Sequence, residues 1–303
     1  MVKEENWLES CRLCPRECGA RRLSGSPGVC GVRAVLKVAR AALHMWEEPC
    51  ISGEQGSGTV FFSGCPLRCV YCQNREISGG RAGKEISEGR LAEIFLELQE
   101  KGAQNINLVT PTHYVPQILE SLRMAKASGL KLPVVFNCSG YEKPEILRSL
   151  EGSIDVYLTD FKYIEEETAR RYSSAPDYPE RAKKALEEMV RQCPKPVFLE
   201  DGIMQKGVIV RHLLLPGRVR EARNIVRYVH ESFGNRVYLS LLNQYTPFGE
   251  LEEKYPELCR RVTKREYNAL IEYALELGVE QGFIQEGNTA GESFIPAFDY
   301  EGV

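Results

Sequence analysis

Short apolar segments rich in β-branched residues alternate with longer amphipathic segments from Thr59 onward, and this alternation constrains the fold more than any other feature. The pattern is typical of parallel strands joined by crossover helices. Each short segment is apolar almost throughout, as strands buried on both faces are. The six expected strands cover residues 59–63, 105–109, 133–137, 154–160, 208–215 and 237–242.

The segments between these strands carry apolar residues at spacings of three and four, which predicts helices with one buried face. Ser87 is an expected N-cap, and Gly102 and Gly129 stand where helices end. The expected helices cover residues 87–101, 116–127, 144–150, 179–192 and 221–232, and a final helix covers 263–277. Six βα units predict an α/β fold, a partial (β/α)6 TIM-like barrel.

Three regions are expected along the 303 residues. Residues 1–56 are rich in Cys, Arg and Gly with weak periodicity, which predicts an N-terminal extension stapled by metal. Residues 57–250 form the core barrel. Residues 251–303 supply the last helix and a Gly/Asn-rich tail that is expected to cover one end of the barrel.

Charge and hydropathy narrow the class of protein. A formal net charge of -3 and a pI near 6.0 give no basic face for nucleic acid, which argues against a nucleic-acid-binding zinc module. The first ten residues are acidic and polar, unlike a signal peptide, and no run of about 18 apolar residues occurs. These features predict a cytoplasmic protein without membrane contact. Eleven cysteines in such a protein more often bind metal than form disulfides.

Three cysteines follow the first expected strand in the order Cys65, Cys69 and Cys72. Their loop therefore lies at the carboxyl end of a strand, where barrel active sites lie. A [4Fe-4S] cluster commonly takes four thiolates, so three leave one iron open, and an open position is typical of a catalytic metal site. The alternatives are a closed zinc site that borrows Cys50 or His113, or three thiols without a ligand role.

The C-x3-C-x2-C loop, with Tyr71 before its last cysteine, resembles the signature of radical S-adenosylmethionine (SAM) enzymes. More narrowly, most of residues 57–245 resemble proteins related to pyruvate formate-lyase activating enzyme. The resemblance implies a [4Fe-4S] cluster whose open iron binds SAM, with Tyr71 beside these cofactors. It implies reductive cleavage of SAM to methionine and a 5′-deoxyadenosyl radical, which abstracts a substrate hydrogen.

The same resemblance implies partners. The electron donor is expected to be a flavodoxin or a ferredoxin. The substrate is a small molecule or a partner protein, and for activating enzymes it is a glycine of a partner enzyme.

The second strand departs from the family pattern. The family often has Gly-Gly-Glu there, where backbone groups meet the SAM amino group, but this chain continues with Thr110, Pro111, Thr112 and His113. Carbonyl and hydroxyl groups from Thr110 to His113 are acceptors suited to an ammonium group. His113 is either a proton donor or a polar loop residue.

Polar residues after the third and fourth strands also match the family. Asn137 and Ser139 resemble the segment that faces the SAM ribose, and Gly140 permits close approach. Asp160 and Lys162 resemble an Asp-x-Lys pair that faces the cavity beside SAM. The alternative for this pair is an ordinary surface ion pair.

The fifth strand places either Arg211 or His212 inside the barrel, because successive side chains alternate between the two faces. Arg211 is favoured as a clamp for the SAM carboxylate, since its planar fork suits bidentate binding. A lone His in an apolar strand is more often structural. After the sixth strand, the residues expected near the adenine or the substrate are Asn243, Gln244 and Tyr245.

A second set of four cysteines lies near the N-terminus, at Cys11, Cys14, Cys18 and Cys30. Four thiolates with glycines nearby make a complete tetrahedral set. Structural zinc is favoured over an auxiliary Fe–S cluster, and either metal would supply folding energy to a segment too short to bury a core. The isolated cysteines are expected to be small packing residues, with the role of Cys50 open; they are Cys138, Cys193 and Cys259.

The competing interpretation is a non-catalytic iron–sulfur or zinc protein that transfers electrons or scaffolds a partner. It predicts four ligands at each metal site. Such a protein needs neither the Asp160 and Lys162 pair nor an inward Arg211.

Overall fold

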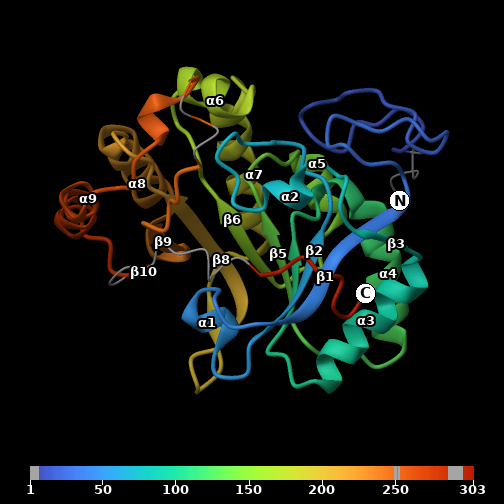
Figure 1. Ribbon diagram of the computed structural model, residues 1–303. Coiled ribbons are helices and arrows are strands. Elements are labelled where there is room, and N and C mark those ends of the chain that lie inside the picture. Colours follow the sequence, from blue (N-terminus) through green and yellow to red (C-terminus); the bar gives the residue numbers. More distant parts are fainter. Residues whose placement is uncertain (1–6, 249–250, 252, 286–295) are drawn as a thin grey trace.

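The fold is described for residues 7–248, 251, 253–285 and 296–303 of a computed structural model, in which ten strands form one open sheet flanked by helices (Figure 1). In spatial order the strands are β10 (Gly282–Ile284), β9 (Tyr238–Leu242), β8 (Met204–Leu213), β6 (Val156–Asp160), β5 (Val134–Cys138), β4 (Ile106–Val109), β2 (Ser57–Phe62), β1 (Leu36–His44) and β3 (Lys84–Ile86), and β7 (Val197–Phe198) pairs with β8. Because β10 and β3 end the sheet, it does not close into a full barrel.

The strands β2, β4, β5, β6, β8, β9 and β10 pair in parallel and follow their order along the chain, whereas β3 and β7 pair antiparallel with β1 and β8. Every residue of β2, β4 and β5 is buried, as expected of strands covered on both faces. The six predicted strands are confirmed, with ends shifted by a few residues. Because βαβ crossovers are right-handed, successive connecting helices lie on one side of the sheet and leave the carboxyl ends of the strands open.

The six predicted helices are confirmed as α3 (Glu88–Glu100), α4 (Val115–Ala127), α5 (Pro144–Ser149), α7 (Tyr178–Gln192), α8 (Val219–Phe233) and α9 (Lys264–Glu276). Ser87 caps α3 by accepting a hydrogen bond from the backbone N–H of Arg90 at 3.1 Å. Elements outside the prediction are α1 (Pro49–Ser52), α2 (Arg75–Ser78), α6 (Glu166–Ser173) and the 3-10 turns η1 (Thr112–Tyr114), η2 (Gly234–Arg236) and η4 (Pro256–Leu258).

Part of the predicted N-terminal extension belongs to the sheet. Strand β1 pairs antiparallel with β2, so a strand of the N-terminal region lies at the side of the parallel core before the first βα unit begins. The end of the chain returns to the same strand, because Tyr300 and Glu301 hydrogen-bond to the backbone of Ala39 and Ala41 (Figure 1). The predicted covering tail falls largely on residues 286–295, outside the described residues. The boundaries at 56 and 250 stay predictions.

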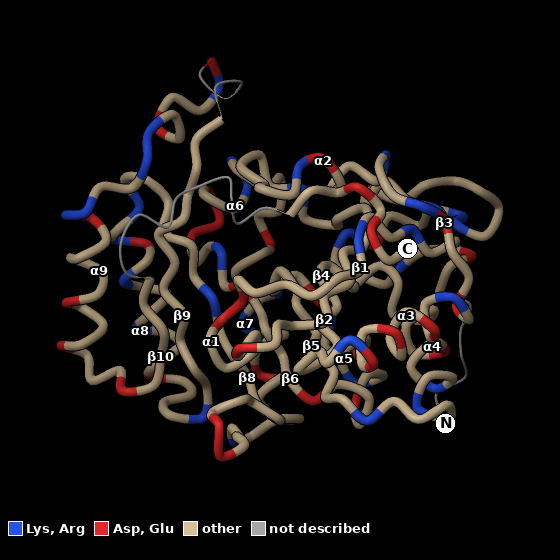
Figure 2. The backbone as a smooth tube through the Cα atoms, turned by 60° about the horizontal axis from the view of Figure 1, so that its bottom comes forward, with Lys and Arg blue, Asp and Glu red and all other residues tan. Residues whose placement is uncertain are grey.

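Charged residues of both signs are spread over the described helices and loops (Figure 2). This distribution agrees with the formal net charge of -3. Among the described helices, none is long and apolar enough to cross a membrane.

Candidate active site

A cavity of about 220 Å³ lies over the inner face of the sheet, where several strands reach their carboxyl ends. It gathers most of the site residues predicted from the sequence. The predicted residues that line it are Cys65, Cys69, Tyr71, Cys72, Thr110, Asn137, Ser139, Asp160, Lys162 and Arg211. Residues that stand far apart in the sequence therefore share one pocket.

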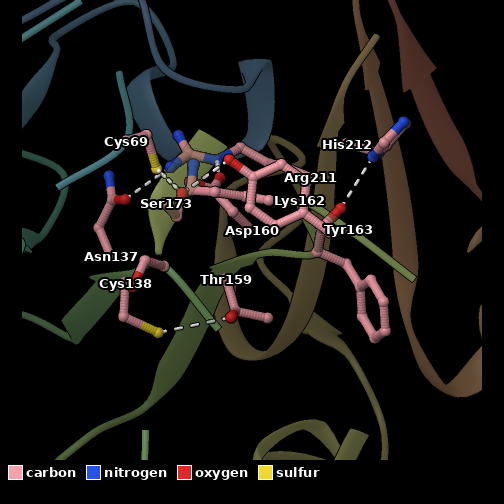
Figure 3. Close-up of polar contacts among 12 residues, drawn as sticks. Cys69, Asn137, Cys138, Thr159, Asp160, Lys162, Tyr163, Ser173, Arg211 and His212 are labelled. Carbon is pink, nitrogen blue, oxygen red and sulfur yellow. Dashed lines mark hydrogen bonds and ion pairs between the residues drawn. The ribbon is translucent and has the colours of Figure 1, made fainter. Parts of the chain in front are cut away.

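The three cysteines lie on the loop of residues 64–74, called here the cysteine loop. Its backbone is held by hydrogen bonds from the Val70 N–H to the Tyr172 carbonyl at 2.9 Å and from the Cys72 N–H to the Cys69 carbonyl at 3.2 Å. The Ser173 hydroxyl donates to the Cys69 sulfur at 3.1 Å (Figure 3). Hydrogen bonds to a ligand sulfur are one of the ways in which a protein tunes a metal centre.

The electrostatics of the thiols suit a cation. Burial raises the pKa of Cys65 to about 12, and the neighbouring Cys72 and Cys69 add to the rise. Burial also raises the pKa of Cys72 to about 11, again with a contribution from Cys69 and against the effect of Lys162. A bound metal reverses this balance, because it deprotonates the thiols that coordinate it. Three thiols that repel one another when ionised therefore fit a metal cluster.

Tyr71 joins the cysteine loop to an aromatic cluster. Its ring makes edge-to-face contacts with Tyr163, Tyr172 and Tyr245 at centroid distances of 6.3, 6.1 and 6.2 Å. The Tyr71 side chain is only 5% exposed. Packed aromatic rings exclude water from the underside of the loop, which lowers the local dielectric around the sulfurs.

A buried charge network occupies the inner face of β5, β6 and β8. The Arg211 guanidinium donates to Asp160 at 2.9 Å and to Asn137 at 2.6 Å, and the Lys162 ammonium donates to Asp160 at 2.6 Å (Figure 3). Burial by itself would raise the pKa of Asp160, but the Lys162 and Arg211 cations hold this pKa below its ordinary value. Asp160 is therefore ionised and fixes both cations toward the cavity.

Glu47 completes this network, and sequence reasoning missed it. It follows β1, enters the cavity, and accepts hydrogen bonds from Arg211 at 3.1 Å, Asn107 at 3.1 Å and Asn137 at 3.2 Å. Burial raises the pKa of Glu47, and Arg211 opposes that rise. The neighbouring Glu48 is buried as well. Two consecutive acidic residues after an alternating segment were the available signal.

Thr110 and His113 are placed differently from each other. Thr110 lines the cavity in a left-handed conformation, with φ of 58°, which is rare for a β-branched residue. His113 is buried outside the cavity lining, and its Nε2 donates to the Ser63 carbonyl at 2.8 Å. Burial lowers the pKa of His113 to about 3, so the ring is neutral. The ring supports the backbone beside the cysteine loop.

Arg211 and His212 lie on opposite faces of β8, as the alternation requires. The His212 Nδ1 donates to the Phe161 carbonyl at 2.8 Å, and burial lowers the pKa of His212 to about 4 (Figure 3). The prediction that Arg211 is the inward residue agrees with this geometry. At Gly140 the close neighbour is the protein backbone, because a β-carbon there would lie 2.3 Å from the Asp160 carbonyl oxygen. Close approach of a ribose to Gly140 stays a prediction.

The residues after β9 divide between the cavity and the core. Gln244 lines the cavity, and its carbonyl accepts a hydrogen bond from the Gln73 side chain at 3.0 Å. Tyr245 lies beneath Tyr71, and its hydroxyl donates to the Leu258 carbonyl at 2.6 Å. The backbone N–H of Asn243 donates to the Gln285 side chain, directly after β10, at 2.9 Å.

The four N-terminal cysteines share one neighbourhood. A β-carbon added to Gly28 would lie 3.2 Å from the Cys30 sulfur and 3.4 Å from the Cys18 sulfur. Burial raises the pKa of Cys14 to about 12, with smaller contributions from Cys11, Cys30 and Cys18. Cys50 packs elsewhere, in an apolar cluster with β5, β6 and β8.

In the part of the chain that the structure describes, no group of three or more His, Cys, Asp or Glu side chains meets the geometry of a bound metal ion. The chemistry and shared surroundings of each cysteine set still suit a metal, and the assignment of ligands stays a prediction from the sequence.

Comparisons with known proteins provide evidence that is independent of the cavity geometry. A sequence model of the radical SAM superfamily matches residues 59–229. An uncharacterized protein of Methanocaldococcus jannaschii, MJ0674, is 29% identical over 283 residues, which cover 90% of this chain and 75% of that protein.

Among solved structures, Streptococcus suis SuiB bound to precursor peptide SuiA is similar with a TM-score of 0.48 and 13% identity, over 74% of this chain and 46% of SuiB. The glycoside hydrolase domain of PelA from Pseudomonas aeruginosa is similar with a TM-score of 0.33 and 17% identity, over 51% of this chain and 59% of that domain. The chain thus spans about half the length of the SuiB chain that it matches.

The superfamily match covers more than half of the chain and includes the cysteine loop together with the strands that supply Asn137, Asp160 and Arg211. On this match, and with an open parallel sheet whose carboxyl ends meet the cysteine loop, the chain belongs to the radical SAM superfamily.

Proposed function

We propose that this radical SAM enzyme holds its [4Fe-4S] cluster with Cys65, Cys69 and Cys72 and abstracts a hydrogen atom from a substrate bound in the same cavity. One observation carries the proposal: the three thiols line the same pocket as the charged ends of β6 and β8. The cofactors supply the chemistry, which is reductive cleavage of SAM and generation of a 5′-deoxyadenosyl radical. The protein supplies binding, orientation and exclusion of water.

The cations of the cavity are suited to the SAM carboxylate. Burial alone would lower the pKa of Lys162, but Asp160 and, to a smaller extent, the nearby Cys69 and Cys72 raise it above its ordinary value. Lys162 lines the cavity, and one of its three N–H donors goes to Asp160. Arg211 spends three donors on protein groups and keeps two. We therefore assign the carboxylate to Lys162 and Arg211 together.

Neutral polar groups also line the cavity, beside apolar side chains and Glu47. Asn137 and Ser139 stand at the end of β5, where their side chains suit ribose hydroxyls. Thr110 contributes its carbonyl and hydroxyl toward the SAM ammonium group, and its left-handed backbone turns the chain at the end of β4. His113 is assigned a supporting role behind the cysteine loop, because its ring hydrogen-bonds to the Ser63 carbonyl.

Replacing Lys162 with methionine is expected to weaken SAM binding by roughly tenfold to a hundredfold, since a lost charge-assisted hydrogen bond is worth about 1.5–3 kcal/mol. The measurement is a SAM titration of the reduced, reconstituted protein, followed by the change in the cluster's EPR spectrum. Lys184→Met is the matched control, because Lys184 pairs with Glu180 on the outer helix α7. Equal SAM affinities in the two variants would exclude Lys162 as a carboxylate ligand.

The four N-terminal cysteines are proposed to bind a second metal, with structural zinc favoured over an auxiliary Fe–S cluster. Mutual proximity of Cys14 with three other thiols supports this proposal. Structural zinc sites take four ligands and need no open position.

Elemental analysis tests this second site. We expect about one zinc per chain, lost in a Cys14→Ala, Cys18→Ala double variant that keeps the iron bound by the cysteine loop. Cys193→Ala, which removes an isolated buried thiol, is expected to keep both metals. Loss of iron in place of zinc would identify an auxiliary cluster, and unchanged metal content would exclude a metal site.

The subtype stays a prediction. Resemblance to pyruvate formate-lyase activating enzyme suggests a glycyl residue of a partner enzyme as the target, with a flavodoxin or ferredoxin as the electron donor. A small-molecule substrate fits the same cavity chemistry. The rival class, an electron carrier or scaffold, does not use an inward charge network beside its metal.

A further inference from the structure

The N-terminal segment of residues 7–34 packs directly against the cysteine loop (Figure 1). The Cys65 N–H donates to the Cys30 carbonyl at 3.2 Å. A β-carbon at Gly64 would lie 2.7 Å from the same carbonyl oxygen, and one at Gly31 would lie 2.3 Å from the Gly79 carbonyl oxygen. The two segments therefore meet backbone to backbone, at positions where only glycine permits the approach.

One side chain of the N-terminal segment reaches further than these contacts. The guanidinium of Arg16 donates hydrogen bonds to four backbone carbonyls that belong to two separate parts of the chain. Its partners are Pro66 at 2.9 Å, Leu67 at 3.3 Å, Ser173 at 2.6 Å and Ser174 at 2.5 Å.

Packing against an aromatic ring also fixes the orientation of the Arg16 guanidinium. Arg16 lies over the ring of Tyr141, with 5.3 Å between the guanidinium carbon and the ring centroid. Only a planar fork with five N–H donors satisfies carbonyls in several directions at once. An ammonium at this position would act as a single point and would leave some of the four carbonyls without a donor.

The two parts of the chain that Arg16 connects both lie next to the proposed cluster ligands. Pro66 and Leu67 lie between Cys65 and Cys69 in the cysteine loop. Ser173 ends α6, and its hydroxyl donates to the Cys69 sulfur at 3.1 Å. Carbonyls at a helix C-terminus carry partial negative charge, which a guanidinium stabilises. A single cation therefore sets the spacing between the loop and the hydroxyl that contacts its central sulfur.

We propose that Arg16 is a positioning residue for the cluster, and that the N-terminal segment acts as a clamp on the cysteine loop through it. This inference rests on the proposed function only in assigning Cys65, Cys69 and Cys72 as cluster ligands. Arg16 lies outside the cavity lining, and its guanidinium bonds to backbone carbonyls rather than to Cys65, Cys69 or Cys72. Its role is to hold the backbone that carries them.

Hydrogen exchange measured by mass spectrometry tests the clamp in Arg16→Ala, Arg16→Lys and Arg12→Ala, each as the reconstituted holoprotein under anaerobic conditions. Arg12 is an exposed arginine of the same segment, so its variant removes the same charge without touching the four carbonyls. In Arg16→Ala, amides of residues 65–72 and 173–175 are expected to exchange at least about tenfold faster than in the wild type. Arg16→Lys is expected to fall between, and Arg12→Ala to match the wild type.

A second readout is the midpoint reduction potential of the cluster, which is expected to shift in Arg16→Ala because the Ser173 hydroxyl loses its fixed place beside Cys69. Wild-type exchange rates and potential in Arg16→Ala would overturn the clamp. So would faster exchange throughout the sheet in both Arg16 variants, which would assign Arg16 to general folding. Exchange needs no SAM cleavage, so a failure of the proposed reaction would be seen separately, as absent 5′-deoxyadenosine in the wild type.

Discussion

Replacing Arg211 with methionine is expected to lower the free energy of unfolding by about 3–5 kcal/mol, the range observed when one partner of a buried ion pair is removed. Arg211 is the cation shared by Glu47 and Asp160 inside the cavity. Asp160 keeps Lys162 in the variant, but among the described residues Glu47 has no other cation at hydrogen-bonding distance. The cost therefore comes mainly from Glu47.

The stability lost in Arg211→Met is expected to depend on pH, and the pKa of Glu47 gives the direction of that dependence. Burial raises the pKa of Glu47 above its ordinary value, and without Arg211 this pKa rises further. A native-state pKa above the unfolded value means that the native state binds more protons, so stability falls as pH rises through that range. The loss in Arg211→Met is thus expected to be smaller at pH 5 than at pH 8.

Urea unfolding followed by circular dichroism measures this loss, with Arg191→Met as the control. Arg191 is half exposed and pairs with the exposed Glu151 and with Glu188, a buried carboxylate. Glu188 keeps Arg148 and Gln192 as partners in the variant, so the expected loss is that of a surface ion pair, about 0–1 kcal/mol. Adding Glu47→Gln to Arg211→Met is expected to recover part of the stability. Equal losses in Arg211→Met and Arg191→Met would show that the network is not a buried ion cluster.

Replacing Cys69 with alanine is expected to abolish the cluster and, with it, all cleavage of SAM. Three thiolates already leave one iron open for SAM, so two cannot retain a stable cubane. Cys69 also accepts the hydrogen bond from Ser173, and its removal leaves that hydroxyl facing an empty position. The effect on activity is larger than that of any other single change considered.

Iron and sulfide content, together with 5′-deoxyadenosine formation, measure this effect. The matched control is Cys259→Ala, because the Cys259 thiol contacts the Tyr255 carbonyl away from the cysteine loop. That variant is expected to keep the cluster. Full iron content and SAM cleavage in Cys69→Ala would remove Cys69 from the ligand set.

The parallel core and most of the cavity were predictable because their signals are local. An apolar segment followed by a polar residue identifies a strand and its carboxyl end, and parallel strands bring those ends together. Asn137, Asp160 and Arg211 share the cavity for this reason. The inward choice of Arg211 over His212 follows from the alternation along β8, with the chemistry of the two side chains deciding the register.

Contacts between segments that lie far apart in the sequence were not predictable. Strand β1 is short of β-branched residues and pairs antiparallel with β2, so the sequence before Thr59 did not resemble another βα unit. Glu47 enters the cavity only because β1 runs beside the core. The place of Arg16 likewise depends on α6, which packs beside the cysteine loop from more than a hundred residues later.

The direction in which side chains point from a turn was not predictable either. His113 follows Thr110 by three residues, yet one lines the cavity and the other lies buried behind the loop. The left-handed backbone at Thr110 and the 3-10 turn η1 decide this difference. A β-branched residue gives no signal for such a conformation, which glycine or asparagine would normally announce.

Radical SAM chemistry at the cysteine loop can be measured by incubating the anaerobically reconstituted wild-type protein with dithionite and SAM and separating the products by chromatography. The assay needs no knowledge of the substrate. We predict methionine and 5′-deoxyadenosine from the wild type and neither product from Cys69→Ala. No cleavage by a protein with a fully reduced cluster and bound SAM would contradict this prediction and would favour an electron carrier or scaffold.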